Sequence, residues 1–529
     1  MQVPSTIVEA PDGAVSTAEA SAESAKGLRA DTLNLFSNTL FAVASVAPAY
    51  SLAVTLGFIV AAVGLHAPFI IIVSFIPMLL VSSAFYQMNK ADPDCGQQFI
   101  WTTRAFGPQI GWAIGFIAVF ASVIVIANLV QVASLYMLEF FNFNGSLDFM
   151  VNSTFWVTFV GCLWIVGITA IVAMGIELSA RTQKVFMFMQ MGSLFIFATW
   201  ALIKAYMAHP AGWAHVYLAW FSWHNLSWAQ VTTGVTLCAF MYWGWDAALS
   251  VNEESKDARK VPGLSAVFAT ITLVCTFVFV AVACQAFAGK SFLTTNAADV
   301  FTPLVAAVGG PSLAGRILFR LVMLAIFTSG AASFLTTLLP LSRSTLSMAA
   351  HGSLPKAFAR VNPRYQTPVF GTIAMAALGM AWYIAVTILS TNILYDAIAG
   401  IGIQVAFTYG AVGICAPVYF RRELFKSARN VFLIGLGPVI GAIVLFMDVF
   451  YAGRHYWDPA NSLTWPDKGV DFFGTHVGVT FVLGIGTIAL AFVVMFAVWP
   501  CYRAFFSRRT ETWPGEGVPL PHANEALNE

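Results

Sequence analysis

Residues 240–262 read FMYWGWDAALSVNEESKDARKVP and pass from the end of an apolar segment into a charged loop that closes with a proline. Gly244 stands between two tryptophans in the apolar part, and Asp246 follows shortly after. Inside a bilayer, a backbone that leaves the helical conformation must find new partners for its N–H and C=O groups. Such a break survives only where it is buried in protein or lines a cavity. The stretch therefore predicts an interrupted membrane-spanning helix with a binding site at the interruption.

The composition of the chain is that of a membrane protein. It has 529 residues, of which 59% are hydrophobic and 10% charged, with a net charge of +1. A soluble domain carries about 25% charged residues, and nucleic-acid binding is typically signalled by a clear excess of positive charge. The seven cysteines show no spacing typical of a metal site. We therefore expect a lipid bilayer around the chain, no nucleic-acid partner and no metal or other cofactor.

Apolar runs predict an all-α integral membrane protein with twelve transmembrane helices, because each crossing needs roughly 20 apolar residues. The runs lie at 35–62, 67–88, 108–140, 154–174, 185–206, 229–251, 263–288, 315–349, 367–390, 393–419, 431–452 and 475–503. Residues 1–30 are rich in Ala, Ser, Glu and Thr and predict a mobile cytoplasmic tail. Residues 507–529 predict a second cytoplasmic tail.

The distribution of positive charge predicts the orientation of the chain. With the N-terminus inside, 20 of the 26 Lys and Arg residues fall in inner segments and six in outer ones. This asymmetry satisfies the positive-inside rule. We therefore expect a multi-pass protein of the plasma (inner) membrane with both termini in the cytoplasm. The six outer residues are Lys204, Lys290, Arg316, Arg320, Arg454 and Lys468.

A second interruption is expected in the first span, where residues 45–51 read SVAPAYS about half-way across. Pro48 removes one helical hydrogen bond and crowds the carbonyl of the preceding turn. Taken alone, this pattern favours a simple kink in a packed helix. The break at residues 242–246 lies five spans later, and paired interruptions in two halves of a chain indicate a transporter's central site.

If spans 1–5 and 6–10 are inverted repeats, the two breaks meet near the middle of the membrane. Freed N–H groups would then face an anionic group of a solute, and freed carbonyls a cationic one. We expect the substrate-binding residues to be Ser45, Val46, Ala47, Pro48, Ala49, Tyr50, Tyr242, Trp243, Gly244 and Trp245. Because the tryptophans alternate around Gly244, Trp243 is predicted to face the substrate and Trp245 to pack.

Four motifs in the expected order resemble the permeases of the amino acid–polyamine–organocation (APC) superfamily, of the bacterial amino acid permease type. Gly244-Trp-Asp246 with Glu253-Glu254, Lys256 and Lys260-Val-Pro262 is similar to the signature after helix 6. The others are Ala91-Asp-Pro-Asp-Cys-Gly96, Gly175-Ile-Glu-Leu-Ser-Ala-Arg181 and Met348-Ala-Ala-His-Gly352-Ser-Leu-Pro355, with Arg343 before the last and Pro368 after it.

The resemblance implies a five-plus-five inverted-repeat, leucine-transporter-like fold with discontinuous helices 1 and 6 and two additional C-terminal helices. The first repeat is then 31–206, the second 207–422, and the last two helices lie within 423–506. In this fold helix 3 commonly lines the site, which makes Asn128 a further substrate-binding residue. An alternative is that Asn128 bonds to a neighbouring helix.

Two positions depart from the family pattern. Most members have a Gly-small-Gly triplet in helix 1 whose amides receive a substrate carboxylate, and Val46-Ala47-Pro48 stands there instead. Pro48 has no N–H to donate. Some proton-coupled members carry a lysine on helix 5 at the position of Gln190, and a neutral amide cannot carry a proton in that way.

Coupling and gating are assigned to six residues: Asp246, Gln190, Ser329, Ser333, Glu253 and Glu254. Intramembrane ionisable groups are functional candidates by default, although Asp246 can equally cap the half-helix that follows it. Glu253 and Glu254 are expected to pair at an inner gate beside Lys256 and Arg259. The helix-8 hydroxyls are either ion ligands, as in sodium-coupled relatives of the fold, or small residues that allow close packing.

We therefore expect a secondary transporter that imports an amino acid with a proton through alternating access. The alternatives are an organic amine or polyamine carrier and an amino acid exchanger. No Walker motif indicates ATP drive, no reactive constellation indicates an enzyme, and no repeated selectivity element indicates a channel. The expected partners are the small solute, the proton and the bilayer, with the chain a monomer or homodimer.

Overall fold

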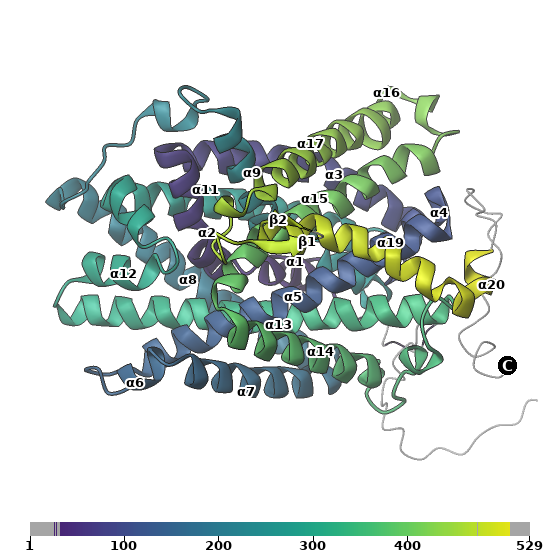
Figure 1. Ribbon diagram of the computed structural model, residues 1–529, viewed down its shortest axis with the longest axis horizontal. Coiled ribbons are helices and arrows are strands. Elements are labelled where there is room, and N and C mark those ends of the chain that lie inside the picture. Colours follow the sequence, from purple (N-terminus) through teal and green to yellow (C-terminus); the bar gives the residue numbers. More distant parts are fainter. Residues whose placement is uncertain (1–25, 27, 29–31, 473, 508–529) are drawn as a thin grey trace, which may run out of the picture.

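The computed structural model describes residues 26, 28, 32–472 and 474–507, with side chains omitted at 176–182. The described chain is built almost entirely from helices that run roughly antiparallel to one another (Figure 1). Ten of its segments are long and apolar enough to cross a membrane. The first of them, Leu35–Ala91, spans 57 residues and contains two of the predicted crossings, while the interrupted sixth crossing is too short to count among the ten. The twelve predicted spans are therefore all helical.

The first and sixth spans are both interrupted. α1 (Leu35–Val46) ends at Ala47, whose left-handed φ of 52° separates it from α2 (Pro48–Val63). α9 (Trp228–Tyr242) ends at Trp243, and the chain resumes as the short α10 (Ala247–Ser250). Pro48 occupies the first turn of α2, where its missing N–H leaves no helical bond unmade. The proline therefore starts a new helix and does not merely kink a continuous one.

The remaining helices complete the predicted crossings and their connections. They are α3 (Ala67–Ala91), α4 (Gln98–Phe106), α5 (Pro108–Phe141), α6 (Asp148–Val151), α7 (Thr154–Ala173), α8 (Ile176–Ala208), α11 (Val261–Thr295), α12 (Phe301–Gly309), α13 (Leu313–Ala350), α14 (Val369–Leu389), α15 (Asn392–Tyr419), α16 (Ala428–Asn430), α17 (Gly437–Trp457), α18 (Val479–Phe481), α19 (Thr487–Val498) and α20 (Arg503–Phe506). The last two spans each contain a π-helical turn, Val431–Leu436 and Val482–Gly486. A two-stranded antiparallel sheet joins them, formed by β1 (Val470–Phe472) and β2 (Thr475–Val477).

The ends of these helices define two faces of the molecule. We call the face where α3 and α13 end, and where α4 and α11 begin, the inner end, since the charge distribution predicts that it is cytoplasmic. The opposite face, where α3 and α13 begin and where α11 ends, is the outer end. Asp396 near the start of α15 holds the outer loop in place by accepting 2.8 Å hydrogen bonds from the amides of Leu463 and Thr464.

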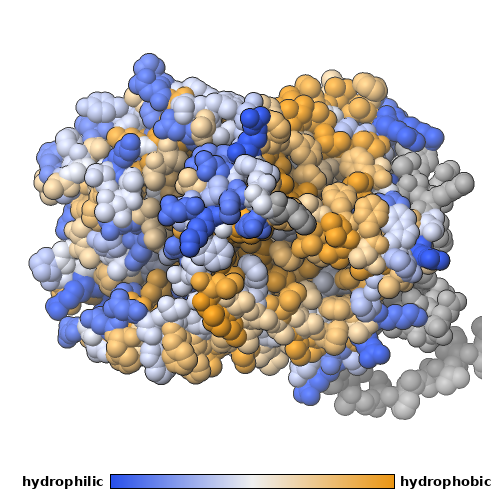
Figure 2. Space-filling model, viewed as in Figure 1, coloured by the Kyte–Doolittle hydropathy of each residue, from blue (hydrophilic) through white to orange (hydrophobic). Residues whose placement is uncertain are grey.

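Burial separates a central group of helices from a peripheral one. In the most apolar window of α15, 83% of the residues are buried, whereas the corresponding share for the last span, Val479–Phe506, is 28%. α13 runs through the centre of the molecule beside α5 (Figure 1). Apolar side chains gather on the surface near α17 and α19 (Figure 2). The central helices carry the candidate site, and the peripheral ones present the surface suited to lipid.

Two residues of the predicted tail 1–30 are packed against the inner end. Lys26 forms ion pairs there, and Leu28 is fully buried against Cys95 and Leu346. This differs from the expectation of a mobile tail for these two residues. The rest of 1–30 and residues 508–529 of the second tail lie outside the described residues.

Candidate functional site

The two helix breaks touch each other through their backbones. A β-carbon built on Gly244 would lie 3.0 Å from the carbonyl carbon and the hydroxyl oxygen of Ser45. Gly244 also has a φ of +115°, a backbone conformation that side chains disfavour. Glycine is therefore required at this position both by the conformation and by the close approach.

Hydrogen bonds from α13 and α2 satisfy the groups that the first break exposes. The Ser333 hydroxyl donates to the Ser45 carbonyl at 2.7 Å, and the Tyr50 amide donates to the Ser329 hydroxyl at 3.2 Å. The Ser51 hydroxyl donates to the carbonyl of Val46. The predicted helix-8 serines thus contact the break in helix 1, where they replace lost helical bonds.

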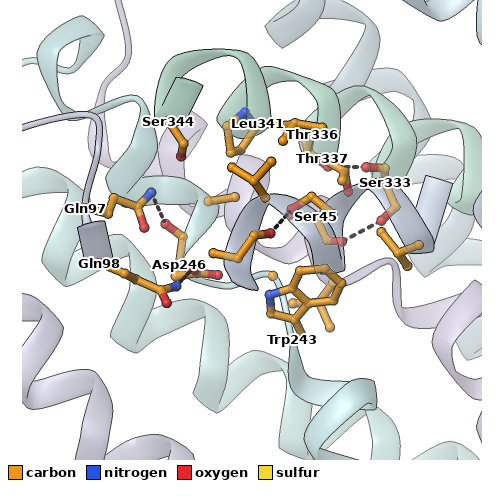
Figure 3. A pocket seen from close by; sticks show the side chains of 18 of the residues that line it. Ser45, Gln97, Gln98, Trp243, Asp246, Ser333, Thr336, Thr337, Leu341 and Ser344 are labelled. Atoms are coloured by element: carbon orange, nitrogen blue, oxygen red, sulfur yellow. Dashed lines mark hydrogen bonds between the residues drawn. The ribbon is translucent and has the colours of Figure 1, made fainter. Parts of the chain in front are cut away.

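A cavity begins at the breaks and extends toward the inner end between α5 and α13 (Figure 3). Its polar lining consists of hydroxyls, two amides and a single carboxylate, and the rest is apolar and aromatic. No lysine, arginine or histidine lines it among the residues that the structure describes. The polar lining residues are Ser45, Tyr50, Ser51, Gln97, Gln98, Ser122, Asp246, Ser333, Thr336, Thr337 and Ser344.

Asp246 is the carboxylate of the cavity, and its side chain is held from two other elements. The Gln98 amide on α4 donates to one carboxylate oxygen at 3.0 Å, and the Tyr409 hydroxyl on α15 donates to the other at 2.7 Å. Gln97 donates to the backbone carbonyl of Asp246 at 3.1 Å (Figure 3). Asp246 stands at the N-cap of α10, but its side chain makes no capping hydrogen bond. The capping alternative is therefore wrong.

Of the other predicted substrate-binding residues, some line the cavity and some do not. Ser45, Val46, Tyr50, Trp243 and Gly244 line it, whereas Ala47, Pro48 and Ala49 are buried in the break behind it.

Tyr242 and Trp245, the aromatic residues nearest to Trp243 in the sequence, point away from the cavity. The Tyr242 hydroxyl donates to the carbonyl of Ile71 at 3.0 Å, and Trp245 is fully buried with its ring 4.9 Å from that of Phe85. Trp243 is the member of this aromatic group that faces the cavity, as the alternation around Gly244 predicts.

Two amides predicted to take part lie elsewhere. Asn128 is buried on α5 between the lining residues Val125 and Leu129 but is not itself among the residues that line the cavity. Gln190 is buried on α8, and its amide donates to the sulfur of Met187 at 3.4 Å. Neither residue lines the cavity.

The start of α2 offers little to an anion. Pro48 has no N–H, the Tyr50 amide is taken by Ser329, and the Ser51 amide donates to the Ala47 carbonyl at 2.8 Å. A helix N-terminus binds anions through unoccupied amides. The amides that would bind a substrate carboxylate in the family pattern are therefore largely missing at this break.

Glu253 and Glu254 lie beyond the cavity in an ion-pair cluster at the inner end. Glu254 binds Arg343 through two hydrogen bonds of 2.7 and 2.8 Å, with both side chains almost completely buried. Lys26 lies 2.7 Å from Glu253 and 2.8 Å from Asp94. The partners are therefore Arg343 and Lys26, not the neighbouring Lys256 and Arg259 that the sequence suggested.

Burial and charge act in opposite directions within this cluster. Burial lowers the pKa of Lys26, but Asp94, Cys95 and Glu253 outweigh it and hold the pKa well above its ordinary value. Burial raises the pKa of Asp94, but Lys26 and His351 outweigh it and hold that pKa well below its ordinary value. Both ion-pair partners are thus charged at neutral pH.

The sequence did not single out Gln97, Gln98, Tyr409 or Lys26. The glutamines follow directly on the Ala91–Gly96 motif, whose turn carries the chain back to Asp246. Tyr409 is a polar aromatic residue in the middle of the apolar α15, a position that in principle signals an interior partner. The sequence predicts that Lys26 lies on the cytoplasmic side, but nothing near it indicates that it pairs with Asp94 and Glu253.

The chain matches the family model described as amino acid permease over residues 33–467. It is similar to the methylthioribose transporter of Bacillus subtilis, with 24% identity over 440 residues that cover 80% of this chain and 88% of the relative. It is also similar to the vacuolar cationic amino acid transporter 4 of Arabidopsis thaliana, at 25% identity over 64% of this chain and 55% of the relative.

A third relative is an importer of an amine. The low-affinity putrescine importer PlaP of Escherichia coli is 19% identical over 383 residues, which cover 72% of this chain and 79% of that protein. The interrupted first and sixth helices, the cavity beside them and the family match over most of the chain all indicate the same kind of protein. The chain belongs to the amino acid permease family and is a multi-span membrane transporter of amino acids or organic cations, not an enzyme.

Proposed function

We propose that this transporter imports a small solute that carries an ammonium group, by alternating access and with a proton bound at Asp246. The observation that carries the proposal is the contact between Ser45 and Gly244, beside a cavity lined by one carboxylate and no described cationic side chain. Such a cavity attracts a cation and repels a free anion.

Three features of the site favour an ammonium group. α1 and α9 both end at the breaks and direct the negative ends of their dipoles there, so an ammonium group is attracted also when Asp246 carries the proton. Trp243 presents an aromatic side chain to the cavity, and a cation over an aromatic face gains about 0.5–2 kcal/mol. The names of two relatives, a cationic amino acid transporter and a putrescine importer, fit this chemistry.

A second candidate function is the import of an amine without a carboxylate. It is favoured by the start of α2, where Pro48 lacks an N–H and the amide of Tyr50 is already bonded. An amino acid carboxylate placed there would find few donors. Asp246 is the sole carboxylate lining the cavity among the described residues, so a monoamine fits better than a diamine.

The proposal includes the membrane, the orientation and the repeat organisation of the protein. The 20-to-6 asymmetry of Lys and Arg supports a plasma-membrane protein with both termini in the cytoplasm. The cavity then extends toward the cytoplasm as far as the ion pairs of Lys26 and Glu254, which close the inner end. The two repeats are residues 31–206 and 207–422, with 423–506 as an added pair of helices, in a monomer or homodimer.

Uptake competition in proteoliposomes tests the proposal. Purified protein is reconstituted, and labelled substrate is competed by amino acids and by their decarboxylated amines, with and without an inward acid gradient. We expect an amine to compete at least as well as its parent amino acid and the acid gradient to accelerate net uptake. Competition by amino acids alone would reject the amine. Inhibition by carboxylates without an ammonium group would reject ammonium recognition altogether, and exchange without net uptake would reject proton-driven import.

A further inference from the structure

Gln98 stands beside Asp246 in an arrangement that suits two protonation states. Its Nε2 donates to Asp246 Oδ2 at 3.0 Å, while its own Oε1 is buried and has no hydrogen-bond partner among the described residues. The other carboxylate oxygen, Oδ1, accepts from the Tyr409 hydroxyl. The amide therefore presents a donor to the carboxylate and keeps an unused acceptor on the same group (Figure 3).

We propose that Gln98 is a positioning residue for proton coupling, whose side-chain amide turns over when Asp246 gains or loses its proton. This inference rests on the proposed function, in which Asp246 binds the coupled proton. In the ionised state Gln98 Nε2 donates to Oδ2, as the structure has it. When a proton from solvent binds Oδ2, the amide rotates and Gln98 Oε1 accepts the new O–H.

The exchange leaves the rest of the site unchanged. Tyr409 donates to Oδ1 in both states, because that oxygen stays an acceptor whether or not Oδ2 carries the proton. Before the amide of Gln98 rotates, its Oε1 lacks a partner, and after the rotation its Nε2 lacks one. The number of unpartnered groups is therefore the same in both states, so neither state is penalised by an extra buried polar group.

The groups around Asp246 leave it free to act as the proton carrier. Tyr409 on α15 and Tyr50 on α2 are the titratable side chains that face this part of the cavity among the described residues. α4 contributes amides, and α5 and α13 contribute hydroxyl and apolar groups. No described lysine, arginine or histidine lines the cavity to fix the charge state of the carboxylate.

Gln97, the residue that directly precedes α4, provides a matched control. It is an equally buried glutamine, but its Nε2 donates to the backbone carbonyl of Asp246 at 3.1 Å and not to the carboxylate. Methionine has nearly the shape of glutamine and lacks its hydrogen-bonding groups. Gln97→Met and Gln98→Met therefore each remove one hydrogen bond to Asp246 and keep similar packing. The bond lost in Gln97→Met goes to the backbone carbonyl of Asp246, and the bond lost in Gln98→Met goes to its carboxylate.

The experiment measures uptake against pH for wild type, Gln98→Met and Gln97→Met in proteoliposomes. Hydrogen bonds to a charged group are the stronger ones, so Gln98→Met weakens the ionised state more than the protonated state. We expect its pH profile to move to higher pH by about one unit, with a fall in kcat and little change in KM. Gln97→Met is expected to keep the wild-type profile, whatever its rate.

A second variant keeps the test decisive if Gln98→Met does not fold. Gln98→Glu has the same size and places a second carboxyl beside Asp246, and two such groups share a proton. We expect an upward shift at least as large as that of Gln98→Met. A wild-type profile in both Gln98 variants, or an equal shift in Gln97→Met, overturns the role of Gln98 while leaving proton coupling intact. Wild-type uptake that does not respond to pH or to an acid gradient overturns the coupling at Asp246 and this inference with it.

Discussion

Ser45 and Gly244 meet backbone against backbone, so closely that a β-carbon on Gly244 would lie 3.1 Å from the Ser45 carbonyl oxygen. Each belongs to a helix that stops within the span, and the two interruptions brace one another. The carbonyl of Ser45 is completed by Ser333 from a third helix. A movement of α13 relative to α1 would release this carbonyl, which links the geometry of the site to the packing of the long helix behind it.

Asp246→Asn is expected to reduce uptake driven by an acid gradient by about tenfold or more, while substrate binding changes less. The amide keeps the shape and accepts the Tyr409 hydrogen bond, but it cannot bind or release the coupled proton. The measurement is gradient-driven uptake beside equilibrium binding in the same preparation.

The matched control is Asp448→Asn on α17. Asp448 is also buried, and it bonds to Thr236 at 2.7 Å without lining the cavity. Equal losses of gradient-driven uptake in the two variants would remove Asp246 from a special role.

The Glu254–Arg343 pair is expected to stabilise the closed inner end. Removing one partner of a buried ion pair costs about 3–5 kcal/mol, because the other charge is left unpaired. Glu254→Gln and Arg343→Met should each lower the thermal stability of the purified protein strongly. The double variant should recover part of the loss, and thermal unfolding of the set gives the coupling energy. Simple addition of the two losses would mean that the pair does not act as a unit.

Lys26 is expected to hold the inner end shut from the N-terminal side. Its ammonium lies between Asp94 and Glu253 and 3.5 Å from the sulfur of Cys95. In Lys26→Met the two carboxylates repel each other, so alkylation of Cys95 should accelerate about tenfold, equal to about 1.4 kcal/mol of lost closure. Mass spectrometry separates Cys95 from the exposed Cys275 and Cys501.

The control for Lys26 is Lys256→Met, which removes an exposed lysine near the same end. It should leave the Cys95 rate unchanged. An acceleration of equal size in both variants would assign the effect to net charge and not to the ion pair of Lys26.

Asp92 gives the inner end a stability that depends on pH. Burial raises the pKa of Asp92 from 3.8 to about 6, with Arg104 opposing the shift. The folded state therefore binds more protons than the unfolded state between these values, and its stability falls as pH rises through that window. Asp92→Asn should remove this part of the slope, measured as unfolding temperature from pH 4 to 7. An unchanged slope in the variant would contradict the assignment.

The helices and their interruptions could be predicted because their signals are local. Apolar runs give the spans, and Pro48 and Gly244 lie within such runs, where each has a direct conformational consequence. The alternation of Trp243 and Trp245 also follows from local geometry. These features need no knowledge of how the helices pack against one another.

The partners of the polar groups could not be predicted, because they come from distant parts of the chain. Gln98 and Tyr409 reach Asp246 across separations of 148 and 163 residues, and Lys26 reaches Glu253 across 227. In helices that are apolar on every side, the sequence does not indicate which face turns inward. Asn128 is an example, because the sequence predicts it as a substrate-binding residue but it is not among the residues that line the cavity.

The most direct measurement compares uptake by Gly244→Ala and Gly352→Ala at equal amounts of folded protein. Both glycines have a left-handed φ, +115° and +76°, so alanine strains both backbones. A β-carbon at Gly352 meets nothing within 4 Å, whereas at Gly244 it meets the backbone of Ser45. The contact predicts that Gly244→Ala loses uptake by about tenfold or more while Gly352→Ala stays within about twofold of wild type. Equal uptake by the two variants would contradict a site built where the interrupted helices meet.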